Sequence, residues 1–204
     1  SRTSQDLPTQ CNRRANKLDG LKEKDLIGIP WMLAFALRAD GWYLRQDIIW
    51  HKPNPMPESV KDRCTKSHEY IFLLSKNKKY YYDNEAIKEP VKQDWGTRNR
   101  DAGKYHNPGT GLQPHSGLTK SYERKNKRSV WSVTVKPYKE AHFATYPPDL
   151  IEPCILAGSE EGDTILDPFM GAGTTAAVAK SLNRHYIGCE LNEGYGNLIQ
   201  KRIQ

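Results

Sequence analysis

Hydrophobic positions recur along most of the chain with helical or strand spacing, and polar, Pro-rich or Gly-rich stretches separate them. In residues 24–40 the apolar side chains fall at helical spacing, Pro30 suits a first helical turn, and Gly41 suits the end of a helix. The continuous apolar run Glu69–Ser75 is typical of a strand that is buried on both faces. Three alternating prolines in residues 51–57 exclude regular structure there.

The same reasoning predicts strands and helices that alternate along the sequence. The predicted strands are Tyr43–Trp50, Glu69–Ser75, Lys79–Asp83, Ser129–Val135, Thr164–Asp167 and Tyr186–Glu190, and the predicted helices are 24–40, Leu150–Ala157, Thr174–Leu182 and Asn192–Ile203. Such alternation is typical of an α/β fold with a largely parallel sheet.

Composition narrows the class of protein. The chain has 204 residues, of which 37% are hydrophobic, which is enough for a core and argues against wholesale disorder. No apolar run approaches the ~20 residues that a membrane span needs, and no signal peptide is visible. The four cysteines (11, 64, 154 and 189) form no CxxC pair, so we expect free thiols in a reducing cytoplasm and no metal site.

Most of the excess positive charge lies in residues 91–130, which hold nine basic and three acidic side chains, five glycines and few aliphatic residues. The segment therefore reads as a long insertion outside the core. Its aromatic residues, such as Trp95 and Tyr105, are interleaved with cations, which suits contact with nucleic acid, although a solvated linker is the alternative. The candidate DNA-binding residues are Arg98, Arg100, Lys104, Lys120, Arg124, Lys125, Lys127 and Arg128.

A glycine-rich loop between a predicted strand and a predicted helix carries the strongest chemical signal. The strand ends at Asp167, Gly171 and Gly173 allow close backbone approach to a ligand, and the helix that follows offers free amide groups. Glu190 ends the next strand, where an acidic side chain usually holds a ribose diol. The pattern predicts a nucleoside-containing cofactor. A dinucleotide is an alternative, because Gly171, Gly173 and Ala176 fit the loose GxGxxG/A pattern, whereas the absence of Gly-Lys-Ser or Gly-Lys-Thr excludes a Walker-type phosphate loop.

The sequence DPFMGAGTT (Asp167–Thr175) resembles the S-adenosylmethionine motif of DNA amino-methyltransferases, DPFxGxGTT, and HFATYPPDL (His142–Leu150) resembles their second cofactor motif. The order of the two halves is that of the β class of these enzymes, in which the catalytic half precedes the cofactor half. The resemblance covers about Asp25–Glu89 and Val130–Gln204. The positions that match the family's DR…HE…K arrangement are Asp62, Arg63, His68, Glu69 and Lys76.

The resemblance implies a Rossmann-like methyltransferase sheet in circularly permuted strand order with a basic insertion. Residues 1–90 would form the catalytic-side half, residues 91–130 the target-recognition region, and residues 131–204 the S-adenosylmethionine-binding half. The implied cofactor-binding residues are Phe143, Thr145, Pro147, Asp167, Phe169, Gly171, Gly173, Thr174, Thr175 and Glu190, with the two threonines capping the helix. The base pocket would include His51, Lys52, Pro53 and Asn54. Apart from the resemblance, the plain interpretation of Arg63 and Glu69 is that they form a salt bridge.

The family's catalytic loop, (Asp/Ser/Asn)-Pro-Pro-aromatic, is not found in this chain. Its one Pro-Pro pair, Pro147-Pro148, lies inside the cofactor motif. The family's sheet order would place the missing catalytic strand between Thr164–Asp167 and Tyr43–Trp50. We therefore expect this chain alone to be inactive and poorly stable unless an N-terminal segment or a second chain supplies the missing piece.

The implied reaction is methyl transfer from S-adenosylmethionine to an exocyclic amino group of an extruded base in double-stranded DNA. Cytosine N4, which the WHKPNPMPES stretch favours slightly, and adenine N6 are both possible targets. The expected setting is the cytoplasm of a bacterium or archaeon, or of a phage host. The alternatives are an RNA methyltransferase, a non-catalytic DNA-binding or regulatory fragment, and a dinucleotide oxidoreductase.

Overall fold

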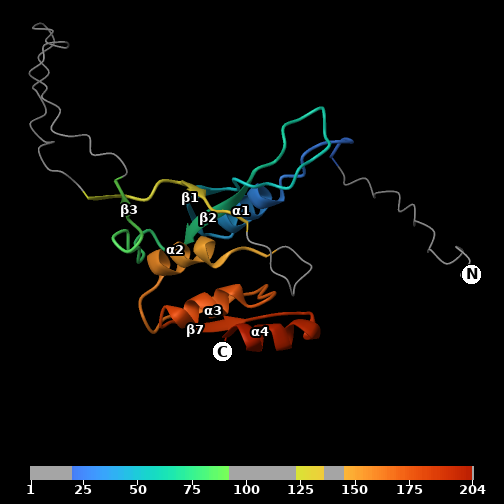
Figure 1. The fold of residues 1–204 in the computed structure, drawn as a ribbon. Helices are drawn as coiled ribbons and strands as arrows, with labels where there is room; N and C mark the ends of the chain where they lie inside the picture. The colour runs from blue at the N-terminus through green and yellow to red at the C-terminus, as the bar shows by residue number, and fades with distance from the viewer. Residues whose placement is uncertain (1–19, 92–122, 136–144, 204) are drawn as a thin grey trace, which may run out of the picture.

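The computed structural model describes residues 20–91, 123–135 and 145–203 (Figure 1). Five strands follow the first helix, and strands and helices alternate in the C-terminal part of the chain. The strands are β1 (Tyr43–His51), β2 (His68–Ser75), β3 (Glu89–Pro90), β4 (Arg124–Lys125), β5 (Val130–Ser132), β6 (Thr164–Asp167) and β7 (His185–Gly188). The helices are α1 (Ile29–Ala39), α2 (Pro148–Gly158), α3 (Thr174–Ser181), the 3-10 turn η1 (Glu193–Tyr195) and α4 (Gly196–Ile203).

The strands of the described ranges form one sheet of three strands and two pairs. In the larger sheet β1 lies between β2, to which it is antiparallel along its whole length, and β5, to which it is parallel at Ile49–His51. The strands β6 and β7 form a parallel pair, and β3 and β4 form an antiparallel pair. The predicted α/β class is confirmed. The expectation of a largely parallel sheet holds for β1–β5 and β6–β7, whereas β1–β2 and β3–β4 are antiparallel.

Helix α2 joins the three-stranded sheet to the part of the chain that carries the glycine loop. Figure 1 shows α2 between the layer of β1 and β2 and the layer of α3 and β7. On one side of α2, Leu150 packs into a buried cluster with Ile48, Trp50 and Trp131. On its other side, Ile155 packs against Val178 and Ala179 of α3. This helix therefore fixes how the two layers sit relative to each other.

Helix α1 begins five residues later than the sequence pattern predicts. Gly28 precedes the helix with a φ of 75°, and Pro30 stands in its first turn. Residue Lys24, where the helix was expected to begin, has a φ of 71°, which no helix accommodates. The helix ends before Gly41, whose φ of 98° matches the glycine that commonly follows a helix.

The predicted strand Lys79–Asp83 is wrong. No residue of that range pairs in a sheet, and Tyr80, Tyr81 and Tyr82 are exposed. Asp83 instead accepts backbone N–H bonds from Glu85 and Ala86 at 2.9 and 3.0 Å, which turns the chain. A carboxylate that binds its own downstream backbone competes with strand pairing in this way.

The C-terminal segment, predicted as one helix over Asn192–Ile203, is divided. Asn192 accepts a hydrogen bond from the Gly194 N–H at 3.0 Å and opens the short turn η1, and α4 follows from Gly196. Among the described residues, no helix combines the length and the apolar composition that crossing a bilayer requires.

Candidate functional site

The glycine loop follows β6 and turns directly into α3. Gly171 and Gly173 have φ angles of 53° and 81°, in the left-handed region that residues with a Cβ seldom adopt. Gly173 also approaches α4, because a Cβ at this position would lie 3.3 Å from Cα of Ile199. Backbone geometry therefore favours glycine at both positions, and more strongly at Gly173, where a Cβ would also press on Ile199.

Asp167, the last residue of β6, holds the loop through both of its carboxylate oxygens. Oδ1 accepts the backbone N–H of Phe169 at 3.0 Å, and Oδ2 accepts the hydroxyl of Thr175 at 2.5 Å. The Tyr146 hydroxyl lies 3.2 Å from the same Oδ2 and 2.5 Å from Thr175 Oγ1. The aspartate therefore connects the loop and the first turn of α3 to Tyr146, which lies 21 residues earlier, just before α2.

Tyr146 is a site residue that the sequence did not single out. It packs against the cluster of Trp50 and Trp131 while its hydroxyl reaches Asp167 and Thr175. Burial raises the pKa of the Tyr146 hydroxyl, which keeps the group protonated and able to donate. Its neighbours in the motif, Thr145 and Pro147, are half-buried and buried respectively.

Glu190 lies just after β7 and faces the glycine loop. Its Oε2 accepts the Gly171 N–H at 2.8 Å, and its Oε1 accepts the Asn192 N–H at 2.8 Å. The backbone joins the same two segments, since the Met170 N–H donates to the Cys189 carbonyl at 2.8 Å. The structure thus brings Asp167, Gly171 and Glu190 together, as the sequence predicted, at the carboxyl ends of two parallel strands.

The prediction that Thr174 and Thr175 cap α3 is wrong. The residue at the N-cap is Gly173, and no side chain caps the helix. Both threonines are buried in its first turn, and the Thr175 hydroxyl is bound to Asp167 instead of the helix backbone. The helix amides at this end are left for other acceptors.

Two large apolar side chains border the glycine loop and remain exposed to solvent. Phe169, a predicted site residue, is 87% exposed, and Leu191, which the sequence did not single out, is 98% exposed. They stand next to Asp167 and Glu190 respectively, at the ends of the two strands. Exposed apolar groups beside a polar loop suit a ligand that has a flat apolar ring.

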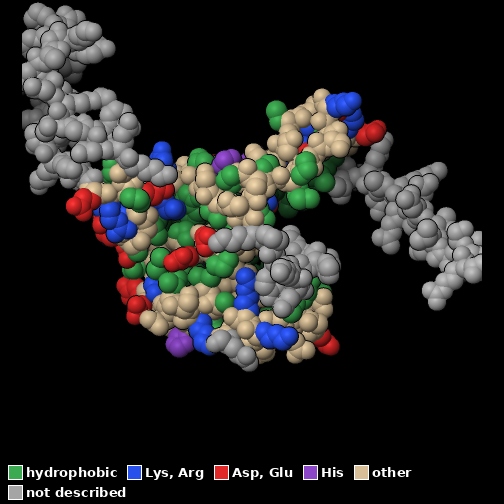
Figure 2. Space-filling view, viewed as in Figure 1, with side chains coloured by type: hydrophobic (Ala, Val, Ile, Leu, Met, Phe, Trp, Pro, Cys, Tyr) green, Lys and Arg blue, Asp and Glu red, His purple; other side chains and the backbone are tan. Residues whose placement is uncertain are grey.

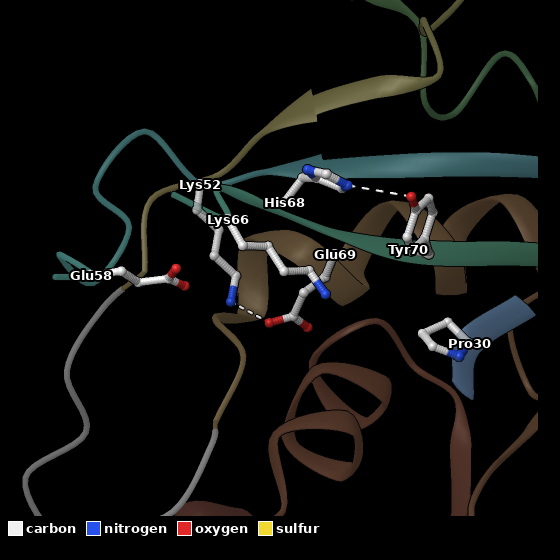
Figure 3. A pocket seen from close by; sticks show the side chains of 7 residues that line it. All are labelled: Pro30, Lys52, Glu58, Lys66, His68, Glu69 and Tyr70. Carbon is white, nitrogen blue, oxygen red and sulfur yellow. Dashed lines mark hydrogen bonds and ion pairs between the residues drawn. The ribbon is translucent and has the colours of Figure 1, made fainter. Parts of the chain in front are cut away.

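Apart from the glycine loop, a pocket lies where β1 ends and β2 begins. This pocket has a volume of about 340 Å³ and is lined by Pro30, Lys52, Glu58, Lys66, His68, Glu69 and Tyr70. Figure 3 shows the side chains of Lys52, Lys66 and Glu69 gathered in it, with Glu58 on one side and Pro30 on the other. Lys52 is ion-paired with Glu69. Of the four predicted base-pocket residues, Lys52 is the one that lines this pocket.

The other three predicted base-pocket residues lie outside the pocket lining. Asn54 exchanges hydrogen bonds with the backbone of Val135, at 3.1 Å from Nδ2 and 3.0 Å to Oδ1, and so ties the Pro-rich loop to the stretch after β5. His51 Nδ1 lies 3.1 Å from Ser132 Oγ. Pro53 is exposed. The expected pair between Arg63 and Glu69 is wrong, because Arg63 pairs with Glu58 at 2.5 Å and Glu69 pairs with Lys52.

The basic residues of the β3–β4 region are partly engaged within the chain. Lys127 and Arg128 each lie 3.7 Å from a carboxylate oxygen of Glu89, and Lys127 also stands over the ring of Trp131. Arg124 donates to the Lys88 carbonyl at 2.9 Å, while Lys125 is half-buried in β4. Figure 2 shows acidic and basic side chains intermixed at this edge of the molecule. Some of the predicted DNA contacts therefore already have partners.

Several predicted residues lie outside the described ranges: Phe143 of the cofactor set and Arg98, Arg100, Lys104 and Lys120 of the DNA-binding set. Within the ranges that the structure covers, no three His, Cys, Asp or Glu side chains are grouped so that they could hold a metal ion.

Comparison with known proteins gives matches along nearly the whole chain. The chain is 49% identical over 191 residues to the Type II methyltransferase M.Cfr9I of Citrobacter freundii, which covers 94% of this chain and 54% of that protein. It is 50% identical over 185 residues to the Type II methyltransferase M.SmaI of Serratia marcescens, covering 91% of this chain and 54% of that protein. The chain thus spans about half the length of these two relatives.

Solved structures agree on the fold. The PvuII DNA methyltransferase (cytosine-N4-specific) superposes with a TM-score of 0.61 at 16% identity, over 92% of this chain and 60% of that one. The M1.HpyAVI–SAM complex gives a TM-score of 0.55 at 23% identity, over 87% of this chain and 71% of that one. The family model of N6/N4 DNA methylases matches residues 10–201, and the chain therefore belongs to this DNA methylase family.

Proposed function

We propose that this chain is the cofactor-binding and target-binding part of a site-specific methyltransferase that transfers a methyl group from S-adenosylmethionine to an exocyclic amino group in double-stranded DNA. The observation that carries the proposal is the loop held by Asp167 and Glu190 in a chain of the DNA methylase family. We favour cytosine N4 as the target on the WHKPNPMPES stretch of the sequence alone, and Lys52 of that stretch lines a pocket at the end of β1.

The residues of the glycine loop fit S-adenosylmethionine. The amides at the start of α3 suit the carboxylate of its methionine part, since no side chain caps that helix end. Each carboxylate oxygen of Glu190 accepts one backbone N–H bond and keeps a second lone pair for a ribose hydroxyl. Phe169 and Leu191 would cover the adenine ring. When bound, the cofactor supplies a methyl group that its sulfonium makes electrophilic, and the chain's part is to orient the two reactants.

We further propose that a polypeptide segment outside this sequence supplies the catalytic strand and the catalytic loop. Among the described strands, β6 pairs with β7 alone, and β1 has a second neighbour at three residues only. On β6 and β7, Leu166 and Ile187 are 63% and 57% exposed. Sheet edges and apolar faces of this kind are normally paired or covered. A further strand with the Pro-Pro-aromatic loop would cover them.

The experiment is methyl transfer from labelled S-adenosylmethionine to unmethylated DNA, followed by digestion and mass spectrometry of the nucleosides. This chain is tested alone and together with the half of M.SmaI that it does not match. We expect no product from the chain alone and N4-methylcytosine from the mixture, with a loss of product in Asp167→Ala. N6-methyladenine would contradict the favoured target, and absence of product from a mixture that binds both cofactor and DNA would contradict the proposed reaction.

A second candidate is a DNA-binding or regulatory protein that keeps the cofactor loop without catalysis. It is favoured by one observation, the lack of a Pro-Pro-aromatic loop in this sequence. The mixture experiment separates the two, because a regulatory protein would bind S-adenosylmethionine but yield no methylated nucleoside with any complementing segment.

A further inference from the structure

The loop between β1 and β2 carries a large apolar side chain that is almost fully open to solvent. Figure 1 shows this loop projecting beyond the end of β1 before the chain returns as β2. Met56 of the loop is 84% exposed, and it stands between Pro55 and Pro57. The two prolines restrict the backbone on either side of it. A methionine side chain left in water gains free energy when a partner covers it.

The backbone that carries Met56 is held on both sides. Two residues before it, the side chain of Asn54 exchanges hydrogen bonds with the backbone of Val135, at 3.1 Å from Nδ2 and 3.0 Å to Oδ1. Two residues after it, the carboxylate of Glu58 accepts a hydrogen bond from Arg63 at 2.5 Å. Because the backbone is already fixed, only the side chain of Met56 would lose freedom on contact with a partner.

The surroundings of Met56 are charged, and this argues for DNA as the partner. Lys61 and Lys66 of the same loop are exposed, and neither forms an ion pair with an acidic residue in the part of the chain that the structure describes. A protein partner normally needs a broad apolar patch. One apolar side chain among cations suits a duplex instead, because its phosphates attract the cations and its stacked bases admit a single apolar wedge.

We infer that Met56 is a wedge that enters the base stack of the duplex at the place that the target base leaves. The inference rests on the proposed function, because methylation of a base amino group in a duplex requires that the base be extruded. The flexible thioether of methionine can adapt to the flat gap that remains between the neighbouring bases. Lys52 and Glu58, which precede and follow Met56 in the chain, both line the pocket at the end of β1 (Figure 3). Met56 therefore acts as a positioning residue for the DNA at that edge of the sheet.

The experiment measures the affinity of this chain for two fluorescently labelled duplexes, one intact and one with a single abasic residue that leaves a gap in the stack. Fluorescence anisotropy is recorded for the unmodified chain, Met56→Ala and Met56→Leu. The matched control is Met32→Ala, which truncates an exposed methionine of α1, outside the loop. A third duplex carries 2-aminopurine beside the abasic residue, and its fluorescence rises when a side chain separates it from its stacked neighbour. Binding of S-adenosylmethionine is measured on the same samples by calorimetry.

We expect the unmodified chain to bind the abasic duplex about tenfold more tightly than the intact one, because Met56 can enter a gap that is already present and leave water. Met56→Ala should remove this preference and the rise in 2-aminopurine fluorescence. Its affinity for the intact duplex should stay nearly unchanged, since phosphate contacts determine that affinity. Met56→Leu should keep most of the preference, and Met32→Ala should keep all of it.

Equal affinities of the unmodified chain for the two duplexes, or no measurable binding of either, would overturn the inference. A preference that persists in Met56→Ala would also overturn it, and is the result expected if Met56 docks on the polypeptide segment outside this sequence. If S-adenosylmethionine binds while the preference for the abasic duplex is absent, this inference fails and the proposed function stands. If S-adenosylmethionine does not bind, the proposed function fails.

Discussion

Asp167 is the residue on which the glycine loop depends most, because its carboxylate accepts bonds from Phe169 and Thr175 and lies near the Tyr146 hydroxyl. In Asp167→Ala these groups lose their partner inside a half-buried network, which costs about 1–3 kcal/mol for each group left unpaired. We expect the affinity for S-adenosylmethionine to fall at least tenfold in calorimetry. The control is Glu193→Gln on the neighbouring exposed turn, and an unchanged affinity in Asp167→Ala would contradict the site.

Gly173 is required by backbone geometry and not by ligand contact alone. A Cβ at this φ of 81° is strained, and it would also press on Ile199 at 3.3 Å. Gly173→Ala should therefore lower the free energy of unfolding by about 1–3 kcal/mol in urea denaturation. The matched variant is Gly158→Ala at the end of α2, where no atom lies within 4 Å and φ is not positive. That variant should be neutral or slightly stabilising, and equal losses in both would refute the argument.

Cys154 gives the fold a dependence on alkaline pH. Burial raises the pKa of its thiol from 9.0 to about 11. Because the folded chain holds this proton more tightly than the unfolded chain, the contribution to stability is complete below pH 9 and is lost as the pH rises toward 11. The expected slope is at most about 1.4 kcal/mol per pH unit.

The measurement is urea unfolding at pH 8 to 11. The decline of stability above pH 9 should be smaller in Cys154→Ala than in the unmodified chain, while Cys64→Ala, at an exposed cysteine, should decline like the unmodified chain. Parallel curves for all three proteins would show that the Cys154 thiol is not the group responsible.

Among the secondary-structure elements, α2 connects the two layers because it packs against both. Leu150 and Ile155 are buried on opposite sides of this helix, and truncation of such side chains costs about 2–5 kcal/mol. We expect Leu150→Ala and Ile155→Ala each to lower the unfolding free energy by that amount. Met32→Ala, on the exposed side of α1, should change it by less than about 0.5 kcal/mol in this chain alone. A loss at Met32 as large as that at Leu150 would contradict the packing described.

Elements with a strong local pattern could be predicted from the sequence, and those that depend on distant partners could not. The long apolar strand β2 and the helix after Gly173 are at or within one residue of their predicted bounds. The three tyrosines at positions 80–82 have a high strand propensity, but without a neighbouring strand to pair with they remain exposed. The pairing of β5 with β1 joins segments about 80 residues apart, and no local pattern reports it.

In the candidate site, too, features encoded locally could be predicted, and those that depend on distant contacts could not. Asp167, Gly171 and Glu190 could be predicted because a strand end, a tight turn and the next strand end are encoded locally. The roles of Tyr146 and of the Lys52–Glu69 pair could not, since each depends on a contact between separate elements. The pairing of Arg63 with Glu69 was assigned wrongly because Glu69 pairs with Lys52, a residue distant in sequence, while Arg63 pairs with Glu58 in its own loop.

In the molecule as a whole, the glycine loop is formed, and the described strands beside it have unpaired edges. The loop is held by bonds within residues 146–192, all of which belong to the described part of the chain, and none of these bonds involves β1 or β2. Cofactor binding should therefore survive in this chain even where catalysis does not.

Equilibrium binding of labelled S-adenosylmethionine to this chain tests whether the glycine loop binds the cofactor without a catalytic segment. We expect saturable binding at one site per chain, displaced by unlabelled S-adenosylmethionine but not by NAD, and lost in Asp167→Ala. Binding should also raise the unfolding free energy, by about 2.7 kcal/mol at a cofactor concentration one hundred times Kd. A chain that is folded by circular dichroism but shows no saturable binding, or in which NAD competes equally, would contradict the account.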